Sequence, residues 1–366
     1  MAKIRVAIAG VGNCASALVQ GVYYYASVPE ERQIPGVMHV KFGPYHIGDI
    51  EFVAAFDVNK RKIGKDLAEA IFTKPNNTIK FANVPKTGVI VKPGPILDGV
   101  TLHMKDSFTP YDEESIRPVN VVEELKAARA DIVVNFLPVG SNLATAYYAN
   151  AAIEARAAFV NCIPVFIASD PSWARKFREV GLPVLGDDIK SQIGATILHR
   201  ALIRLLHMRG VIIDETYQLN IGGDTDFKNM LTEERLASKR ISKTKAITTL
   251  LPYGEILEKK GRVRIGPSDY VPFLNNTKIA YIFIRGRKFG NIPIKIDVKL
   301  EVTDAPNSAG VVIDAIRAAK IALDRGMSGA IIGPSAYFFK HPPKQAPSDE
   351  IAREWVELFI KGKDIS

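Results

Sequence analysis

Lysines and carboxylates gather between residues 220 and 245, in NIGGDTDFKNMLTEERLASKRISKTK. Lys239 and Lys243 are four positions apart, so on a helix they would share one face. Like charges at this spacing repel each other, which favours an anion bound between them or a proton-transfer role for one of them. Asp226, which follows two glycines, is a candidate partner for the pair. Isolated lysine pairs at this spacing more often form a solvated basic face, and that interpretation stays open.

The segment GDDIKSQ, residues 186–192, ends an expected strand and leads into an expected helix. Ser191, Gln192 and the backbone amides after them would lie at the N-terminus of that helix, where free N–H groups and the helix dipole favour a phosphate. In the alternative interpretation, Asp187 or Asp188 is an ordinary N-cap of the helix. The apolar face of the helix would consist of Leu198, Leu202, Leu205 and Leu206.

Three further charged residues stand at the ends of expected elements. Lys278 opens an apolar strand, Asp304 stands at the entry to a helix, and Lys340 follows the aromatic residues of SAYFFK. Each also has an ordinary explanation, as a surface lysine, a helix-entry acid, or a lysine whose stem packs while its charge reaches water. The six histidines show no HxxxH or HExxH pairing, so the sequence indicates no metal site.

A glycine-rich turn follows the first apolar run, at residues 10–15 (GVGNCA), and precedes a helical pattern. A Gly-x-Gly turn between a strand and a helix lets the backbone approach a pyrophosphate, and the helix N-terminus supplies free N–H groups. The third position of the pattern holds alanine, which the pattern permits. The turn therefore predicts a dinucleotide site that includes Gly10, Gly12, Asn13, Cys14 and Ala15.

Asp57 closes the second apolar run and is placed to accept hydrogen bonds from the ribose hydroxyls of adenosine. An acid at this point disfavours the extra phosphate of NADP by like-charge repulsion, so we expect NAD. Asp57 stands 45 positions after Gly12, against about 20 in the usual pattern. An insertion at residues 27–50 accounts for the excess. A plain tight turn with an N-capping aspartate is the alternative interpretation.

The elements that must position these residues alternate between strand and helix. Apolar strand-like runs precede helix-like runs at 131–138 and 141–155, at 157–167 and 171–181, and at 183–188 and 191–210. This alternation predicts an α/β fold with a doubly wound parallel sheet of the Rossmann type.

The pattern changes after residue 210. Residues 211–223, 278–286 and 292–304 alternate apolar and polar side chains, which predicts antiparallel strands with one covered face. We therefore predict an inserted α+β domain at 211–303, which binds substrate and mediates oligomerisation. Residues 1–210 and 304–366 would form the NAD-binding domain, because the helix-like run 307–326 returns the chain to it.

Composition excludes several classes of protein. At 366 residues, with 47% apolar and 24% charged residues, the chain is ordinary and globular, with two domains expected. No run approaches a membrane span, and the start enters a strand directly, so no signal peptide or membrane association is expected. Cys14 and Cys162 are far apart, which favours a reducing cytoplasm. The formal charge is +9, but no dense basic run with interleaved aromatics indicates nucleic acid.

Taken together, these segments resemble the inositol-1-phosphate synthase family in its shorter bacterial and archaeal form. The resemblance covers nearly the whole chain, and its specificity comes from the order and joint presence of the segments. They read GVGNCASALVQGV, GVMHVKFGPYHIGDIEFVAAFDV, NNTIKFANV, FLPVGS, FVNCIPVFIASDP, GDDIKSQIGAT, NIGGDTDF, ASKRISKT, TDAPNSAGVVIDAIRAAK and SAYFFK. The resemblance implies a Rossmann domain with an inserted α+β domain, and assembly into a homo-oligomer that we expect to be a tetramer.

The resemblance also implies roles for residues at matching positions. The catalytic set would be Asp188, Asp226, Lys239, Lys243, Lys278, Asp304 and Lys340. The sugar phosphate would lie against Ser191, Gln192 and Thr196. Further contacts with the dinucleotide would come from Asp66, Ala128, Tyr148, Ser191, Asp226 and Lys239.

The implied reaction is the NAD-dependent cyclisation of glucose 6-phosphate to 1D-myo-inositol 3-phosphate. It proceeds by oxidation at C5, enolisation at C6, aldol closure onto C1 and reduction of the ketone. Lys278 and Lys243 would act at the C5 oxygen, and Lys340 and Lys239 at the C1 oxygen and the phosphate. Asp226 and Asp304 would orient the lysines. A divalent metal or a monovalent cation is a further possible cofactor that the sequence does not decide.

Two other functions are compatible with the same motifs. A conventional NAD-dependent dehydrogenase with a Rossmann and an α+β domain would release one NADH for each product. An NAD-sensing regulatory protein would bind NAD and a polyanion without turning over a sugar phosphate.

Overall fold

The first strand shows how the main sheet is built. In this computed structural model, which describes residues 3–101, 104, 107–230 and 244–363, β1 (Ile4–Ala9) is almost wholly buried. Ile4, Val6 and Ile8 join the core on one face of the sheet, whereas Ala7 and Ala9 join the core on the other. This period of two is that of a β-strand. Because both faces of the strand are apolar, both faces of the sheet are covered.

Within the described residues, β1 belongs to a sheet of seven parallel strands. The others are β4 (Ile50–Asp57), β5 (Val91–Pro93), β6 (Ile132–Asn135), β7 (Ala158–Asn161), β8 (Pro183–Leu185) and β13 (Gly329–Ala330). They lie in the order β13-β8-β7-β6-β1-β4-β5. This is the doubly wound order, in which the strand order reverses between β1 and β6. The predicted fold class is confirmed.

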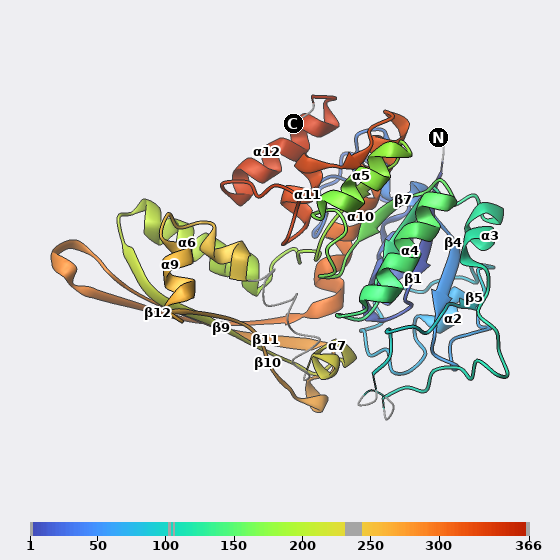
Figure 1. The fold of residues 1–366 in the computed structure, drawn as a ribbon, viewed down its shortest axis with the longest axis horizontal. Coiled ribbons are helices and arrows are strands. Elements are labelled where there is room, and N and C mark those ends of the chain that lie inside the picture. The colour runs from blue at the N-terminus through green and yellow to red at the C-terminus, as the bar shows by residue number, and fades with distance from the viewer. Residues whose placement is uncertain (1–2, 102–103, 105–106, 231–243, 364–366) are drawn as a thin grey trace.

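Helices cover both faces of this sheet (Figure 1). On one face lie α1 (Asn13–Tyr25), α10 (Asp304–Asp324), α11 (Ile332–Phe338) and α12 (Asp349–Ile360). On the other lie α3 (Val121–Ala127), α4 (Asn142–Glu154) and α5 (Pro171–Glu179). The long helix α10 returns the chain from the second sheet and packs against α1, β6, β7 and β8, as the sequence predicts.

The described parts of two insertions, at residues 27–50 and 73–118, contain little regular structure. The first forms the small hairpin β2 (Lys41–Phe42) and β3 (Tyr45–His46) and the short helix η1 (Ile47–Asp49). Phe42 and Tyr45 of this hairpin are buried in the main core. The short helix α2 (Leu67–Ala70) precedes the second insertion, which contains β5. The helix-like sequence IGKDLAEAIF at residues 63–72 therefore forms only this short helix.

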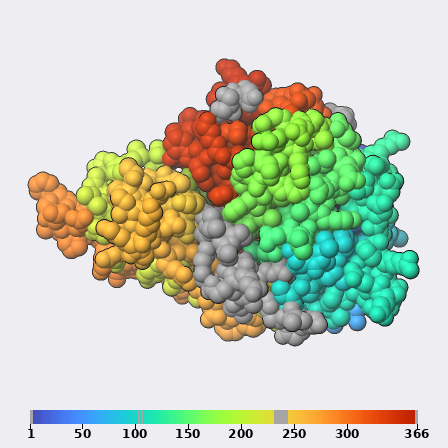
Figure 2. Space-filling model, in the orientation of Figure 1, coloured from blue at the N-terminus to red at the C-terminus, as the bar shows by residue number. Residues whose placement is uncertain are grey.

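The second sheet has the order β10-β9-β11-β12. Its strands are β9 (Ile212–Gly222), β10 (Val263–Tyr270), β11 (Thr277–Arg287) and β12 (Pro293–Thr303), with the short helices η3 (Pro272–Leu274) and η4 (Phe289–Asn291) between them. The three predicted strands pair antiparallel. β10, which the sequence pattern did not predict, pairs parallel with β9, so the sheet is mixed. Figure 2 shows this sheet and its helices projecting from the rest of the molecule.

Helix α6 (Ala195–Met208) packs against β9 and β11, with α7 (Thr225–Asn229) and α9 (Gly254–Lys259) near the same sheet (Figure 1). The expected apolar face of α6 is partly wrong: Leu206 is buried, but Leu205 is 58% exposed and Ile203 is buried instead. The predicted domain boundary places α6 with the Rossmann domain, although its apolar side covers the second sheet. The boundary stays a prediction.

Candidate functional site

Two adjoining cavities open at the switch point between β1 and β6. Cavity A has a volume of about 210 Å³, and cavity B of about 110 Å³. Both are lined by Gly12 after β1 and by Phe136 to Pro138 after β6. Doubly wound sheets bind their ligands at this place, outside the carboxyl ends of the strands.

The two glycines of the turn, Gly10 and Gly12, serve different purposes. Gly10 has φ +92°, and a Cβ there would lie 2.8 Å from the carbonyl oxygen of Phe136, so the chain itself requires glycine. A Cβ on Gly12 would meet nothing within 4 Å. Because Gly12 lines both cavities, its missing side chain leaves room for a ligand beside the N-terminus of α1. Asn13 and Cys14 line cavity A, whereas Ala15 is buried in α1.

Asp57 lies at the far end of cavity B with both carboxylate oxygens hydrogen bonded. Oδ2 accepts from the Val11 amide at 2.9 Å, and Oδ1 from the Asn59 amide at 2.8 Å. Lys62 Nζ lies 3.8 Å from Oδ2 and donates to the Val11 carbonyl at 2.7 Å and to Asn76 Oδ1 at 2.9 Å. The acid, the glycine turn and the loop at residue 76 therefore form one buried network.

This end of cavity B offers a hydrogen-bond donor to a ligand. Asn59 is 2% exposed and lines cavity B, and its Nδ2 has no hydrogen-bond partner within the described part of the chain. A buried donor without an acceptor is costly, so an acceptor from a ligand would stabilise it. Tyr148 also lines this cavity, and burial raises the pKa of its hydroxyl well above the ordinary value.

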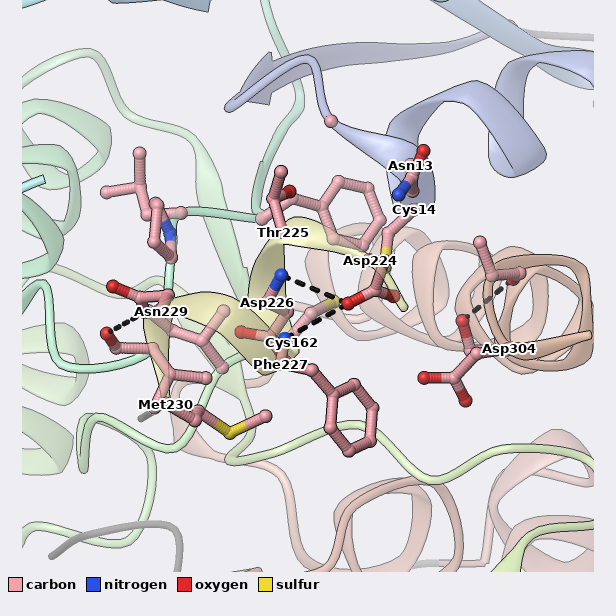
Figure 3. A pocket seen from close by; sticks show the side chains of 18 of the residues that line it. Asn13, Cys14, Cys162, Asp224, Thr225, Asp226, Phe227, Asn229, Met230 and Asp304 are labelled. Carbon is pink, nitrogen blue, oxygen red and sulfur yellow. Dashed lines mark hydrogen bonds between the residues drawn. The ribbon is translucent and has the colours of Figure 1, made fainter. Parts of the chain in front are cut away.

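Cavity A gathers charged residues from both sheets. Lys278 of β11 pairs with Asp304, the first residue of α10, with Nζ 3.1 Å from Oδ1 and 3.4 Å from Oδ2. Asp226 of α7 lines the same cavity (Figure 3). Lys278 and Asp304 thus form a lysine–aspartate pair in this cavity, whereas Lys239 and Lys243, the predicted partners of Asp226, lie outside the described residues.

Asp224 is a buried acid in cavity A that the sequence reasoning missed. Its Oδ1 caps α7 by accepting from the amides of Asp226 and Phe227 at 3.0 and 3.1 Å (Figure 3). Burial, followed by the nearby charges of Asp226 and Asp304, raises its pKa to about 7. Its ordinary role as a helix cap is the sequence signal that points to it. Its raised pKa depends on packing.

A second lysine–carboxylate pair, Lys340 with Asp188, also lines cavity A. Lys340 Nζ donates to Asp188 Oδ1 at 2.8 Å and to the Ile189 carbonyl at 2.6 Å. Asp188 does not cap α6, whose N-cap is Gly194, so the capping interpretation is wrong. Asp187 does not cap it either, because its buried carboxylate accepts from Asn161 and from the amides of Ile167, Ala168 and Ser169.

A third cavity of about 20 Å³ lies at the N-terminus of α6, beside Lys278 and Lys340. Ser191 and Thr196 line it together with Gly194 and Ala195. Because the N-cap is glycine, it has no side chain that could accept from the free amides of α6. Two lysines and a helix N-terminus thus meet at one point, an arrangement that suits a phosphate.

The carboxylate of Asp349, at the start of α12, pairs with two buried cations near this cavity. It accepts from Lys190 at 3.0 Å and from Arg200 of α6 at 2.9 Å, and both cations are almost wholly buried. Lys190 also donates to the Ala336 carbonyl, and Arg200 to the Ala246 carbonyl. Burial alone would raise the pKa of Asp349, but the two cations lower it to about 2. Burial lowers the pKa of Lys190 to about 8.

The structure thus brings many of the predicted residues together. Those that line cavity A are Gly12, Asn13, Cys14, Asp188, Ser191, Asp226, Lys278, Asp304 and Lys340. Those that line cavity B include Gly10, Asp57 and Tyr148. Lys239 and Lys243 lie outside the described residues.

Three predicted residues lie elsewhere. The carboxylate of Asp66 accepts from Ala68, Thr87 and Gly88, so it stabilises its own loop. Ala128 ends α3, where its carbonyl accepts from Arg5. Gln192 lines a separate cavity behind the Ser191 loop. Their predicted ligand contacts stay predictions.

The described residues contain no group of three or more His, Cys, Asp or Glu side chains arranged to hold a metal ion. Within the same residues, no helix is long and apolar enough to cross a membrane.

A parallel sheet with a charged cavity at its switch point and a second sheet beside it define a Rossmann-type α/β protein with an additional α+β unit. A sequence model described as myo-inositol-1-phosphate synthase matches residues 194–305. The chain is 56% identical to the inositol-3-phosphate synthase of Mycolicibacterium smegmatis, with 98% of each chain covered. It is also 56% identical to that of Corynebacterium glutamicum, again with 98% of each covered. A solved structure, a myo-inositol-1-phosphate synthase-related protein from Thermotoga maritima MSB8, matches with a TM-score of 0.77, 26% identity and 100% of both chains covered. The chain belongs to the myo-inositol-1-phosphate synthase family.

Proposed function

We propose that this protein is an isomerase that converts glucose 6-phosphate into 1D-myo-inositol 3-phosphate, with NAD as a cofactor that is regenerated in each cycle. The observation that carries the proposal is cavity A, where two lysine–aspartate pairs from distant segments face one space beside the glycine turn. The names of the relatives at 56% identity support the same reaction.

The residues of cavity B would hold the adenosine half of the cofactor. Gly12 and the N-terminus of α1 would receive the pyrophosphate, and Asp57 and Asn59 the adenosine. When bound, NAD would supply a hydride acceptor for the sugar carbon and return that hydride later. The chain's own contribution there is to orient the cofactor toward cavity A.

The lysines would stabilise negative charge on the sugar oxygens. Lys278 is held by Asp304, and Lys340 by Asp188, so both ammonium groups are oriented before the sugar arrives. Donors that are oriented in advance stabilise an oxyanion or enolate better than mobile ones, because they need not reorganise. We propose Lys278 at the C5 oxygen and Lys340 at the C1 oxygen. Lys239 and Lys243 keep the roles that the family resemblance implies.

The phosphate of the sugar would lie at the N-terminus of α6. Ser191, Thr196 and the free amides after Gly194 surround that point, and Lys278 and Lys340 line it from the other side. An anion held there by backbone N–H groups and two cations would fix the sugar between the lysines.

The decisive test is stoichiometric. Glucose 6-phosphate is incubated with a trace of NAD⁺, and inositol phosphate is measured together with the absorbance of NADH. The proposal requires product in many-fold excess over NAD⁺ with no lasting NADH. One NADH per product would identify a conventional dehydrogenase, and NAD binding without turnover would identify a regulatory protein.

We also propose a cytoplasmic homotetramer in which the second sheet forms at least one interface. The face of this sheet opposite α6 carries Tyr217 and Leu219 on β9 opposite Phe283 and Tyr281 on β11, with 36 to 41% exposure for Tyr217, Leu219 and Tyr281. Apolar side chains on an open sheet favour association. Light scattering should give a tetramer mass, and Tyr281→Glu should lower it. An active monomer at micromolar concentration would contradict the proposal.

A further inference from the structure

Cavity B contains a buried pair of opposite charges, Asp57 and Lys62. Among the described residues that line it, Asp57 and Lys62 are the charged ones. Their side chains are 11% and 4% exposed, and Oδ2 and Nζ are 3.8 Å apart. Sequence reasoning treats Asp57 as a lone negative charge that repels the 2′-phosphate of NADP. The structure shows instead that the acid lies beside a buried cation.

Two short hydrogen bonds use two of the three N–H donors of Lys62. An ammonium group carries three donors, and two of them are used at 2.7 and 2.9 Å by the Val11 carbonyl and by Asn76. The distance to Asp57 is longer than a hydrogen bond. Lys62 also lines cavity B, so its third donor is available to the Asp57 carboxylate or to a ligand. Asn59 Nδ2, which has no partner in the described part of the chain, is a second donor at the same end.

We propose that Lys62 is a specificity-determining residue of the dinucleotide site, and that it forms a latent 2′-phosphate site which Asp57 masks. While Asp57 is present, its carboxylate accepts from the ribose hydroxyls. It also neutralises the charge of Lys62 and fills the space beside it, so NAD is preferred. Without Asp57, the ammonium group of Lys62 is buried without its neighbouring negative charge, and burial lowers its pKa. A buried unpaired charge is costly, and a phosphate would neutralise it. This inference rests on the proposed use of a dinucleotide.

The expected consequence is an inversion of preference by one substitution. Asp57→Ser should raise the affinity for NADP⁺ about tenfold or more and lower that for NAD⁺, because one charge-assisted contact is gained and one carboxylate contact is lost. The NADP⁺ affinity of this variant should weaken with added salt more than its NAD⁺ affinity does. A repulsive carboxylate acting alone predicts a smaller effect, in which the two affinities merely approach each other.

The experiment measures equilibrium binding of NAD⁺ and NADP⁺ by calorimetry to the full-length protein, without substrate. Lys62→Gln is added to Asp57→Ser, because glutamine can still donate to the Val11 carbonyl without charge. The matched control is Lys65→Gln in the same background, since Lys65 is more exposed, pairs with Glu69 and does not line cavity B. The gain in NADP⁺ affinity should disappear with Lys62→Gln and persist with Lys65→Gln.

The possible failures are distinguishable. Parent protein that binds neither dinucleotide would overturn the proposed cofactor itself. If the parent binds NAD⁺ but Asp57→Ser gains no NADP⁺ affinity, or keeps its gain with Lys62→Gln, the role of Lys62 is overturned and the cofactor assignment stands. Should the double variant unfold, the salt dependence of Asp57→Ser alone decides, because equal salt dependence for both dinucleotides excludes a phosphate on Lys62.

Discussion

Cavities A and B share a wall but are built in different ways. Among the described residues, the charged lining of cavity B is Asp57 and Lys62, which lie close together in the chain and are bound to backbone and amide groups nearby. Cavity A takes its charged residues from β11, α7, α10 and the loops after β8 and α11. Its lysines are held by carboxylates from other elements. The charged residues of cavity B thus come from one sheet, whereas those of cavity A come together only where the two sheets meet.

The largest effect is expected from removing a lysine of cavity A, which tests whether the two cavities have separate roles. Lys278→Met should lower turnover by a factor of about 10³, because one oriented donor to a developing oxyanion is lost. NAD⁺ affinity should change less than twofold, since Lys278 does not line cavity B. Turnover is measured as inositol phosphate, and affinity by calorimetry. Lys299→Met, at an exposed lysine of β12, is the control. A parallel loss of NAD⁺ affinity would show that the two cavities are not separate.

A smaller effect on catalysis should follow from removing Asp349, whose partners Lys190 and Arg200 lie next to the proposed phosphate site. Asp349→Ala leaves Lys190 and Arg200 buried without their carboxylate, at a cost of about 3 kcal/mol or more. The KM for glucose 6-phosphate should rise about tenfold, because Lys190 precedes Ser191 and Arg200 lies on α6, and kcat should fall less.

Glu350→Gln is the matched control for that variant, since Glu350 is an exposed partner of Arg204. An unchanged KM together with a lower melting temperature would assign Asp349 a purely structural role.

Asp224 gives a prediction about pH. Its folded-state pKa of about 7 lies above the ordinary 3.8, so between these values the folded protein holds a proton that the unfolded chain has released. This contribution to stability is present at low pH and is lost as the pH rises through 7. Asp224→Asn keeps the cap of α7 and removes the titration. Its melting temperature should therefore exceed that of the parent by several degrees above pH 7 and fall to the parent value near pH 4.

That comparison uses thermal scans of both proteins across the pH range. A difference in melting temperature that does not change with pH would show that Asp224 carries no raised pKa.

The smallest effect on turnover is expected at Lys245, two residues after Lys243. Its Nζ lies 3.6 Å from Glu258 and 3.8 Å from Glu255, and exposed pairs of this kind contribute about 1 kcal/mol or less. Lys245→Ala should change turnover less than about twofold, whereas Lys243→Ala should abolish it while NAD⁺ binding persists. Comparable losses in both variants would indicate a general basic surface.

Much of the fold could be predicted from local patterns. The period-two burial of β1, the glycine turn and the entry of α10 at Asp304 all depend on residues close together in the chain. β10 was missed because its sequence VRIGPSDY contains glycine and proline and does not alternate cleanly. The apolar face of α6 was partly misplaced because the second sheet, and not the helix's own leucines, selects the side that is buried.

The sequence by itself indicated the doubly wound α/β class, the glycines of the turn and the candidate lysines and aspartates, because these follow from local patterns and from resemblance to the family. Only the tertiary structure decided which charges meet. Lys190 and Asp349 are 159 positions apart, and Lys340 and Asp188 are 152 apart. It also decided that Lys62 lies beside Asp57 instead of in solvent, and that burial raises the pKa of Asp224. The physical reason is that pairing and desolvation of charges depend on distance in space, which spacing along the chain does not specify.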